Sequence, residues 1–183
     1  MKPLASQALL LLVLATSTGP AALAQPRPPA RPDTLIAVPP PPPSRSAFSD
    51  PAGRVTGRAV TTGSPSNTLS RVRDAAGRSE GTVRSSSTGP TRHSTVTDAS
   101  GRTTGRASTT AQGQGSHTRF VDASGRVTGS ARTHVAGATV HTTFTDPSGR
   151  VTGRATTTHA AGSSITRLRD ASGRHTGTLR TGR

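Results

Sequence analysis

Arginine is the residue type whose chemistry is most evident in this sequence. It supplies 22 of the 23 cationic side chains, against eight Asp and Glu residues, and the formal net charge is +15. A guanidinium group presents a planar fork of donors that fits phosphate and carboxylate groups bidentately. Two arginine series recur every 48 residues, and we predict that together they form a polyanion-binding surface: Arg58, Arg106 and Arg154, and Arg84, Arg132 and Arg180.

The 48-residue spacing indicates that two kinds of repeat alternate along the chain. A third arginine series has the same period and consists of Arg71, Arg119 and Arg167. The intervening repeats hold uncharged residues in all three columns, for example Thr82, Ser108 and Thr143. Like charges on neighbouring strands repel, so the alternation is expected to lengthen the gap between equivalent cations. Duplication of a 48-residue segment would leave the same pattern.

Other residue types with catalytic or ligating chemistry do not form a convincing site. His93, His117 and His141 share a column with a 24-residue spacing, but the column has no carboxylate or Cys to complete a metal site. The sequence lacks a Gly-x-Ser-x-Gly nucleophile motif and a glycine loop followed by a helix. We therefore predict no enzymatic activity, cofactor, metal or small-molecule substrate. No stacking aromatics accompany the basic charge, so a dedicated nucleic-acid partner is not predicted either.

The elements that position the arginines come from a 24-residue repeat, in which each Asp opens the motif Asp-(Pro/Ala)-(Ala/Ser)-Gly-Arg. Asp favours the first position of a type I turn, and Gly tolerates the positive φ that follows it. This combination is typical of a three-residue hairpin loop with a G1 bulge. In such a loop each Asp is expected to form an ion pair with the Arg four positions later. The predicted structural turn residues are Asp50 and Gly53, Asp74 and Gly77, Asp98 and Gly101, Asp122 and Gly125, Asp146 and Gly149, and Asp170 and Gly173.

Segments between the turns favour strands, because they are rich in Thr, Val and Ser. A second, looser turn lies midway through each repeat, so a repeat contributes two strands. A further Gly, four positions after the turn Gly, argues against helix. The expected core consists of two columns, one lying two positions before each Asp and one two positions after the further Gly. These are Phe48, Val72, Val96, Phe120, Phe144 and Leu168, and Ala59, Val83, Ala107, Ala131, Ala155 and Leu179.

The resulting fold prediction is all-β: an array of six β-hairpin repeats with about twelve short antiparallel strands over roughly 44–181. Such a core is thin, because aromatic residues make up 2% of the chain. Low hydrophobicity is also typical of chains that fold only on a partner, and that alternative stays open. An open sheet, a solenoid and a closed barrel are all compatible with the repeat. Neither strand face is continuously apolar and aromatic girdles are missing, so an outer-membrane barrel is not predicted.

The N-terminal region predicts export. Residues 1–24 resemble a secretory signal peptide, with Lys2, an apolar stretch from Leu4 to Ala15 and a small-x-small site at its end. Residues 25–43 are expected to form a disordered proline-rich linker that favours polyproline II, followed by the repeat domain over 44–183. We expect cleavage before Gln25 and a location in the periplasm, at the cell surface or outside the cell.

The motif Asp-x-x-Gly-Arg at the head of a strand resembles the tyrosine–aspartate (YD) repeats of bacterial Rhs-type surface and toxin proteins. The match rests on the six Asp, the six turn Gly and the following Arg54, Arg78, Arg102, Arg126, Arg150 and Arg174. The tyrosine that precedes the Asp in that family is replaced here by Ser49, Arg73, Thr97, Val121, Thr145 and Arg169. The resemblance implies hairpin repeats in a spiralling sheet and a surface or carbohydrate-binding role.

Together these patterns predict an exported, non-enzymatic repeat protein that binds anionic polymers of the envelope or the extracellular space. The expected partners are anionic polysaccharide, lipopolysaccharide or an anionic membrane surface, contacted through the arginine face. Two alternatives remain at this point. One is a structural or surface-coating protein without a specific ligand, and the other is a disordered basic segment that folds on a partner.

Overall fold

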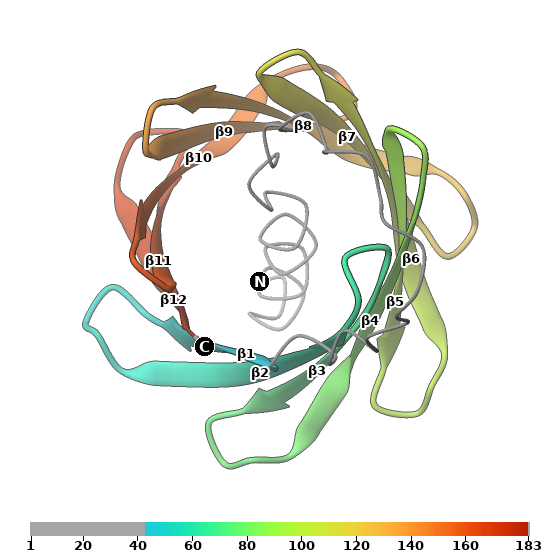
Figure 1. Ribbon diagram of the computed structural model, residues 1–183, viewed down its shortest axis with the longest axis vertical. Coiled ribbons are helices and arrows are strands. Elements are labelled where there is room, and N and C mark those ends of the chain that lie inside the picture. The colour runs from blue at the N-terminus through green and yellow to red at the C-terminus, as the bar shows by residue number, and fades with distance from the viewer. Residues whose placement is uncertain (1–42, 183) are drawn as a thin grey trace, which may run out of the picture.

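The protein forms a closed β-barrel (Figure 1). The computed structural model describes residues 43–182, so the predicted signal peptide 1–24 and the linker to residue 42 lie outside the described residues. Each strand pairs antiparallel with its neighbours in sequence, and β1 pairs with β12 to close the barrel. The predicted all-β array of six hairpins and twelve antiparallel strands is confirmed, and the closed barrel replaces the open sheet and the solenoid.

The twelve strands have similar lengths and are joined by short turns. Their bounds are β1 Ser44–Ser49, β2 Val55–Gly63, β3 Asn67–Asp74, β4 Ser79–Thr88, β5 Thr91–Asp98, β6 Thr103–Gln112, β7 Gly115–Asp122, β8 Val127–Ala136, β9 Thr139–Thr145, β10 Val151–Ala160, β11 Ser163–Asp170 and β12 His175–Gly182. The Asp turns join β1 to β2, β3 to β4 and so on, and all of them lie at one rim. The looser turns join β2 to β3, β4 to β5 and the later pairs at the other rim.

The Asp turns have the geometry that the sequence predicts. In the first of them the Gly53 N–H donates to the Asp50 carbonyl at 3.0 Å, and the Asp50 N–H donates to the Arg54 carbonyl at 3.0 Å. Gly53 has a φ of +82°, which favours glycine, and the register shifts between Phe48 and Ser49 as a bulge requires. The other five Asp turns repeat this arrangement, so each hairpin begins with the same bend.

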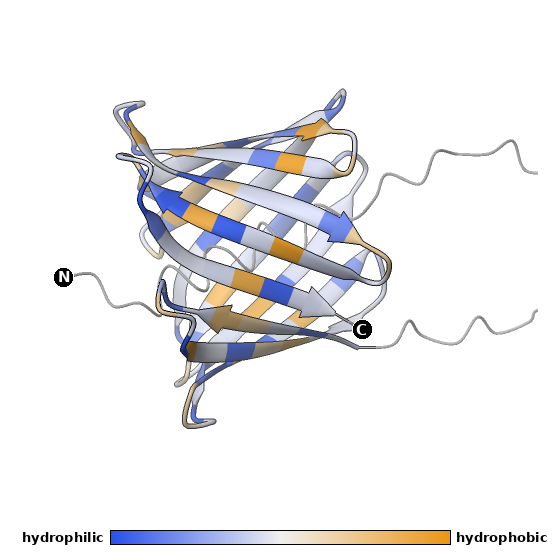
Figure 2. Cartoon of the chain, turned by 90° about the vertical axis from the view of Figure 1, so that its left-hand side faces the viewer, coloured by the Kyte–Doolittle hydropathy of each residue, from blue (hydrophilic) through white to orange (hydrophobic). Residues whose placement is uncertain are grey.

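Alternate residues of a barrel strand face opposite sides, and here the buried side chains share one face, the inner one. The two apolar columns predicted as core meet there as cross-strand pairs, several of which combine a large with a small side chain. Ala107 pairs with Phe120, and Ala155 pairs with Leu168. Figure 2 shows the short hydrophobic blocks that alternate with hydrophilic ones along the strands. Eight of the twelve predicted core residues form one buried cluster, Val96 and Phe144 pack against it, and Ala155 and Leu168 lie outside it.

A ring of hydroxyl pairs on the inner face accompanies the apolar ring. In each pair the Ser or Thr hydroxyls of neighbouring strands hydrogen-bond at 2.7–3.1 Å. The pairs are Ser46–Thr181, Thr61–Ser70, Ser85–Ser94, Thr109–Thr118, Thr133–Thr142 and Thr157–Thr166. Polar groups that are buried in this way cost little, because each satisfies its neighbour. From the sequence these Ser and Thr residues were expected to lie in strands, but their pairing was not predicted.

The further Gly of each repeat lies where two strands approach closely. A Cβ atom at Gly153 would stand 2.8 Å from the Arg169 carbonyl oxygen on β11, and one at Gly177 would stand 2.8 Å from the Ser49 carbonyl oxygen on β1. Real Cβ atoms do not approach a backbone oxygen this closely. The column of glycines therefore permits the close strand spacing next to each bulge. From the sequence these glycines argued only against helix.

Candidate functional site

The six arginines predicted to bind polyanions all lie on the outer face of the barrel. Each follows or precedes a buried residue by one position, as Arg58 precedes Ala59, so strand alternation turns its side chain outward. All six side chains are exposed. No hydrogen bond or ion pair from these six guanidinium groups is found within residues 43–182. Their donors are thus available to a ligand.

Strand register groups the six arginines into three pairs around the barrel, rather than into one continuous patch. Arg84 on β4 and Arg106 on β6 both lie opposite Thr95 on β5. Arg132 and Arg154 flank Thr143 in the same way, and Arg180 and Arg58 flank Ala47. We call these the Thr95 pair, the Thr143 pair and the Ala47 pair.

Each pair forms a fork that is suited to a single anionic group. Strands are spaced by about 4.8 Å, so the two arginine Cα atoms of a pair lie about 10 Å apart. The side chain between them is short and half-buried, which leaves the space above it open to both guanidinium groups. Two guanidinium groups converging on one phosphate, sulfate or carboxylate group can share its oxygens.

Two of the pairs have a third arginine directly opposite one member. Arg58 faces Arg73 on β3, and Arg154 faces Arg169 on β11. Arg73 and Arg169 belong to a different sequence column, so the expected spacing of equivalent cations does not separate these two pairs of residues. The guanidinium groups of Arg73 and Arg169 lie toward the rim of the barrel that carries the Asp turns. Arg73 Nη1 donates to the Gly77 carbonyl at 2.9 Å, and Arg169 Nη1 donates to the Gly173 carbonyl at 2.8 Å. These bonds direct the positive charges away from the pair.

The expected ion pairs between the turn Asp and Arg residues form in one case within the described residues. Arg78 Nε lies 2.8 Å from Asp74 Oδ2. In all six turns the Asp Oδ1 instead accepts the backbone N–H of the Arg four positions later at 2.9 Å. Three of the other turns carry a Ser hydroxyl that competes for the same oxygen. The turn therefore holds its Asp by neutral donors, and most turn arginines extend into solvent.

Hydrogen bonds lower the pKa of four turn carboxyls, those of Asp74, Asp98, Asp146 and Asp170. The Ser148 hydroxyl donates to Asp146 Oδ1 at 2.7 Å and lowers the pKa of that carboxyl below its ordinary value, and Ser172 does the same for Asp170. A bond from the Arg78 side chain lowers the pKa of Asp74. A lowered pKa means that the bond stabilises the folded state at neutral pH and that this contribution is lost as the pH falls through the lowered pKa. The turn carboxylates therefore accept hydrogen bonds within their own turns and stabilise them.

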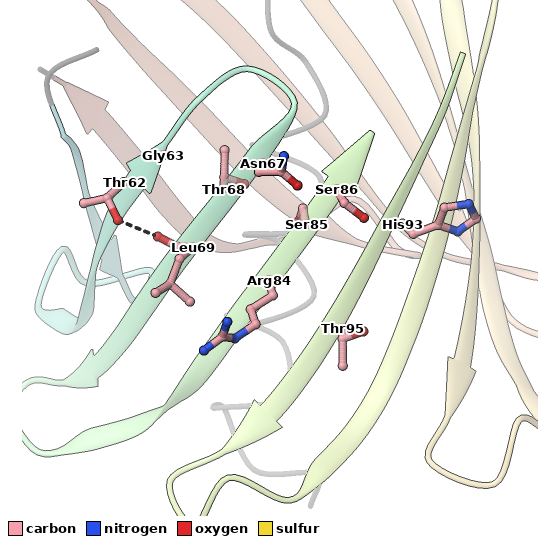
Figure 3. Close-up of a pocket in the computed structure, with 10 residues that line it drawn as sticks. All are labelled: Thr62, Gly63, Asn67, Thr68, Leu69, Arg84, Ser85, Ser86, His93 and Thr95. Atoms are coloured by element: carbon pink, nitrogen blue, oxygen red, sulfur yellow. Dashed lines mark hydrogen bonds between the residues drawn. The ribbon is translucent and has the colours of Figure 1, made fainter. Parts of the chain in front are cut away.

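A shallow groove accompanies the Thr95 pair (Figure 3). It has a volume of about 390 Å³ and lies across strands β2 to β5. Arg84 and Thr95 line it, with Leu69 and His93 on the flanking positions. The groove adds hydroxyl and imidazole groups to one arginine of the pair, beside an apolar side chain. This combination suits an anionic group on a hydroxylated carrier such as a saccharide.

The histidine column does not stack as a ladder, because neighbouring strands are staggered. Across these two strands the register advances two residues more than the 24-residue period, so His93 leads through Ser108 to Arg119 rather than to His117. His117 lies opposite Arg132 instead. His134, which the sequence analysis did not single out, lies opposite His141. Within residues 43–182 no group of three His, Cys, Asp or Glu side chains is placed to hold a metal ion.

Arg92 is an exception among the arginines, because it lies on the inner face and contacts the second rim. Its Nη2 donates to Thr68 Oγ1 at 2.8 Å, and Nη1 lies 3.4 Å from both the Pro65 carbonyl and Ser87 Oγ. Burial lowers its pKa, and its Nε is buried without a partner in the described part of the chain. In the same column the other repeats hold small or apolar residues. Arg92 therefore ties three strands together and does not belong to the outer surface.

Comparison with known proteins finds no matching family model, no matching curated protein and no matching solved structure. The described residues contain no helix that is long and apolar enough to span a membrane.

Proposed function

We propose that this protein is an exported, non-enzymatic repeat protein that binds anionic polymers through its outer arginine face. The observation that carries the proposal is the arrangement of the six arginines as three exposed pairs, free of protein hydrogen bonds within residues 43–182. A surface that served only solubility would not require cations to be grouped two by two. Pairing instead suits oxyanions, which accept several donors at once.

The placement of the pairs favours a long ligand over a small one. They lie on strands β12 to β2, β4 to β6 and β8 to β10, so they are distributed around the circumference. A polymer that contacts one pair raises the effective concentration of its neighbouring charges at the next. Polysaccharides with acidic groups, lipopolysaccharide and anionic membrane surfaces all offer repeated charges. The predicted signal peptide would bring the protein to these partners, and the resemblance to YD repeats supports a role at a surface.

A binding measurement with two charge-matched variants tests the proposal. In the first variant Arg58, Arg84, Arg106, Arg132, Arg154 and Arg180 are changed to Gln. In the second the turn arginines Arg54, Arg78, Arg102, Arg126, Arg150 and Arg174 are changed to Gln, which removes the same formal charge. Affinity of the purified full-length proteins for heparin and for lipopolysaccharide is measured across a range of salt concentrations, with circular dichroism as the folding control.

The paired-arginine variant is expected to bind about 100-fold more weakly at physiological salt and to show a shallower salt dependence. Each cation near an anionic surface contributes about 1 kcal/mol. The turn variant is expected to lose much less. Equal losses in the two variants would mean that net charge alone matters and would favour the surface-coating alternative. Absence of binding by the unmodified protein to either ligand would reject the proposal.

A further inference from the structure

We infer that the Thr143 pair is a proton-dependent subsite for sulfate and phosphate esters, distinct from the other two pairs. This inference rests on the proposed function and specifies how one part of the arginine face is regulated. Three imidazole groups gather around Arg132 on the outer face, and they come from three neighbouring strands. They are His117 on β7, His134 on β8 and His141 on β9.

Register places these histidines in direct contact range of the pair. His117 lies opposite Arg132 across one strand spacing. His134 follows Arg132 by two positions on the same face and lies opposite His141. His141 in turn lies opposite Thr156 on β10, two positions from Arg154. Side chains that are directly opposite one another have Cβ atoms about 5 Å apart, so His117 is adjacent to Arg132 and His134 to His141, on the same face as an anion that bridges the pair.

The other two pairs lack this arrangement at equivalent positions. At the Thr95 pair, His117, His134 and His141 are replaced by Leu69, Ser86 and His93. At the Ala47 pair the same positions hold Ile165, Gly182 and Arg45. The three pairs therefore carry three, one and no imidazole groups. Histidine is the side chain whose charge ordinarily changes between pH 5 and 8, so the three pairs should respond differently to pH.

Charged groups around the cluster come from several strands. Cations lie on both sides of it, namely Arg119 on β7, Arg167 on β11 and the pair itself, whereas Arg169 on β11 is hydrogen-bonded to the Gly173 carbonyl at the rim. The carboxylates of these strands, Asp122, Asp146 and Asp170, lie at the turns and are bonded there. Cations disfavour additional positive charge on an imidazole, whereas a bound anion favours it. Anion binding and proton uptake are therefore coupled at this subsite.

Affinity for heparin and for long-chain polyphosphate, which carry sulfate and phosphate groups respectively, tests the inference at pH 5.5 and pH 8.0 at one ionic strength. The unmodified full-length protein is expected to bind both about ten-fold more tightly at pH 5.5. In the variant His117→Asn, His134→Asn and His141→Asn, this difference is expected to disappear. The matched control changes His93, His159 and His175 to Asn and should keep most of the difference.

Each outcome bears on the inference. A cluster variant that retains the full pH dependence, or a control that loses it, overturns the inference. Equal binding of the unmodified protein at the two pH values also overturns it, while leaving the proposed function intact. Absence of binding at both pH values rejects the proposed function itself. Dependence on pH with only one of the two polymers identifies which ester the subsite prefers.

Discussion

The inner and outer faces of the barrel are built from the same strands but obey different rules. Apart from Arg92, inner positions hold similar classes of residue in all six repeats, so that face has a 24-residue period. Outer positions alternate between arginine and uncharged residues, so that face has a 48-residue period and three-fold pseudo-symmetry. The hydroxyl pair Thr109–Thr118 has a counterpart in every repeat, whereas the pair Arg84 and Arg106 recurs only twice more.

This difference shows which constraints act on each face. Inner side chains must pack against a neighbour one strand spacing away. Every hairpin offers the same space, so similar residues recur in each repeat. Outer side chains meet solvent and are free of that constraint. Packing therefore does not impose the period of 48 on the outer face, and paired cations are the feature that the longer period produces.

The largest expected effect is at the inner face of β7. Phe120, which is 5% exposed and packs against Ala107, lies next to the outward-facing Arg119. Phe120→Ala should lower the free energy of unfolding by about 3–5 kcal/mol, because it opens a cavity in the apolar ring. Arg119→Ala should change it by less than about 0.5 kcal/mol. Denaturant unfolding followed by circular dichroism measures both, and similar losses would contradict the contrast between the faces.

A smaller effect is expected where strands approach closely. Gly153→Ala introduces a Cβ that would meet the Arg169 carbonyl oxygen, and it should cost about 1–3 kcal/mol. Gly182→Ala is the matched control, because no atom lies within 4 Å of the added Cβ there. Thermal unfolding of the two variants compares them directly. Equal stability would show that the barrel wall adjusts at the bulge and that the glycine column has another origin.

The smallest expected difference concerns hydroxyl pairs on the two faces. Thr118→Val leaves the buried Thr109 hydroxyl without its partner and should cost about 1–2 kcal/mol. The double change Thr109→Val and Thr118→Val should recover part of that loss. Thr97→Val breaks the half-buried pair with Thr82 on the outer face, where water can replace the bond, and should cost less. A double-mutant cycle without coupling between Thr109 and Thr118 would remove this distinction.

Local regularities explain why much of the fold could be predicted. The turn residues, for example Asp50 and Gly53, specify a bend through their own backbone preferences. Alternation along a strand then assigns Ala59 to the core and Arg58 to the opposite face without any knowledge of the neighbours. The composition of the apolar columns was sufficient to identify the core. Each of these inferences uses contacts within one hairpin.

Relations between hairpins could not be predicted in the same way. Arg84 and Arg106 belong to different sequence columns, and their common neighbour Thr95 becomes visible only in the register of β4, β5 and β6. For the same reason His93, His117 and His141, which share a sequence column, do not lie side by side in the sheet. The Asp–Arg ion pairs were overestimated, because backbone and Ser donors reach the carboxylate first, as Ser148 does at Asp146.

The sequence by itself determined the bend, the two-residue alternation and hence which side chains are buried and which are exposed. These follow from short-range backbone and packing preferences that are the same in every repeat. Closure of β1 on β12, and the stagger that brings distant arginines and histidines to one row, were decided only by the tertiary structure. Register across a sheet depends on hydrogen bonds between strands that are far apart in sequence, and no single repeat encodes it.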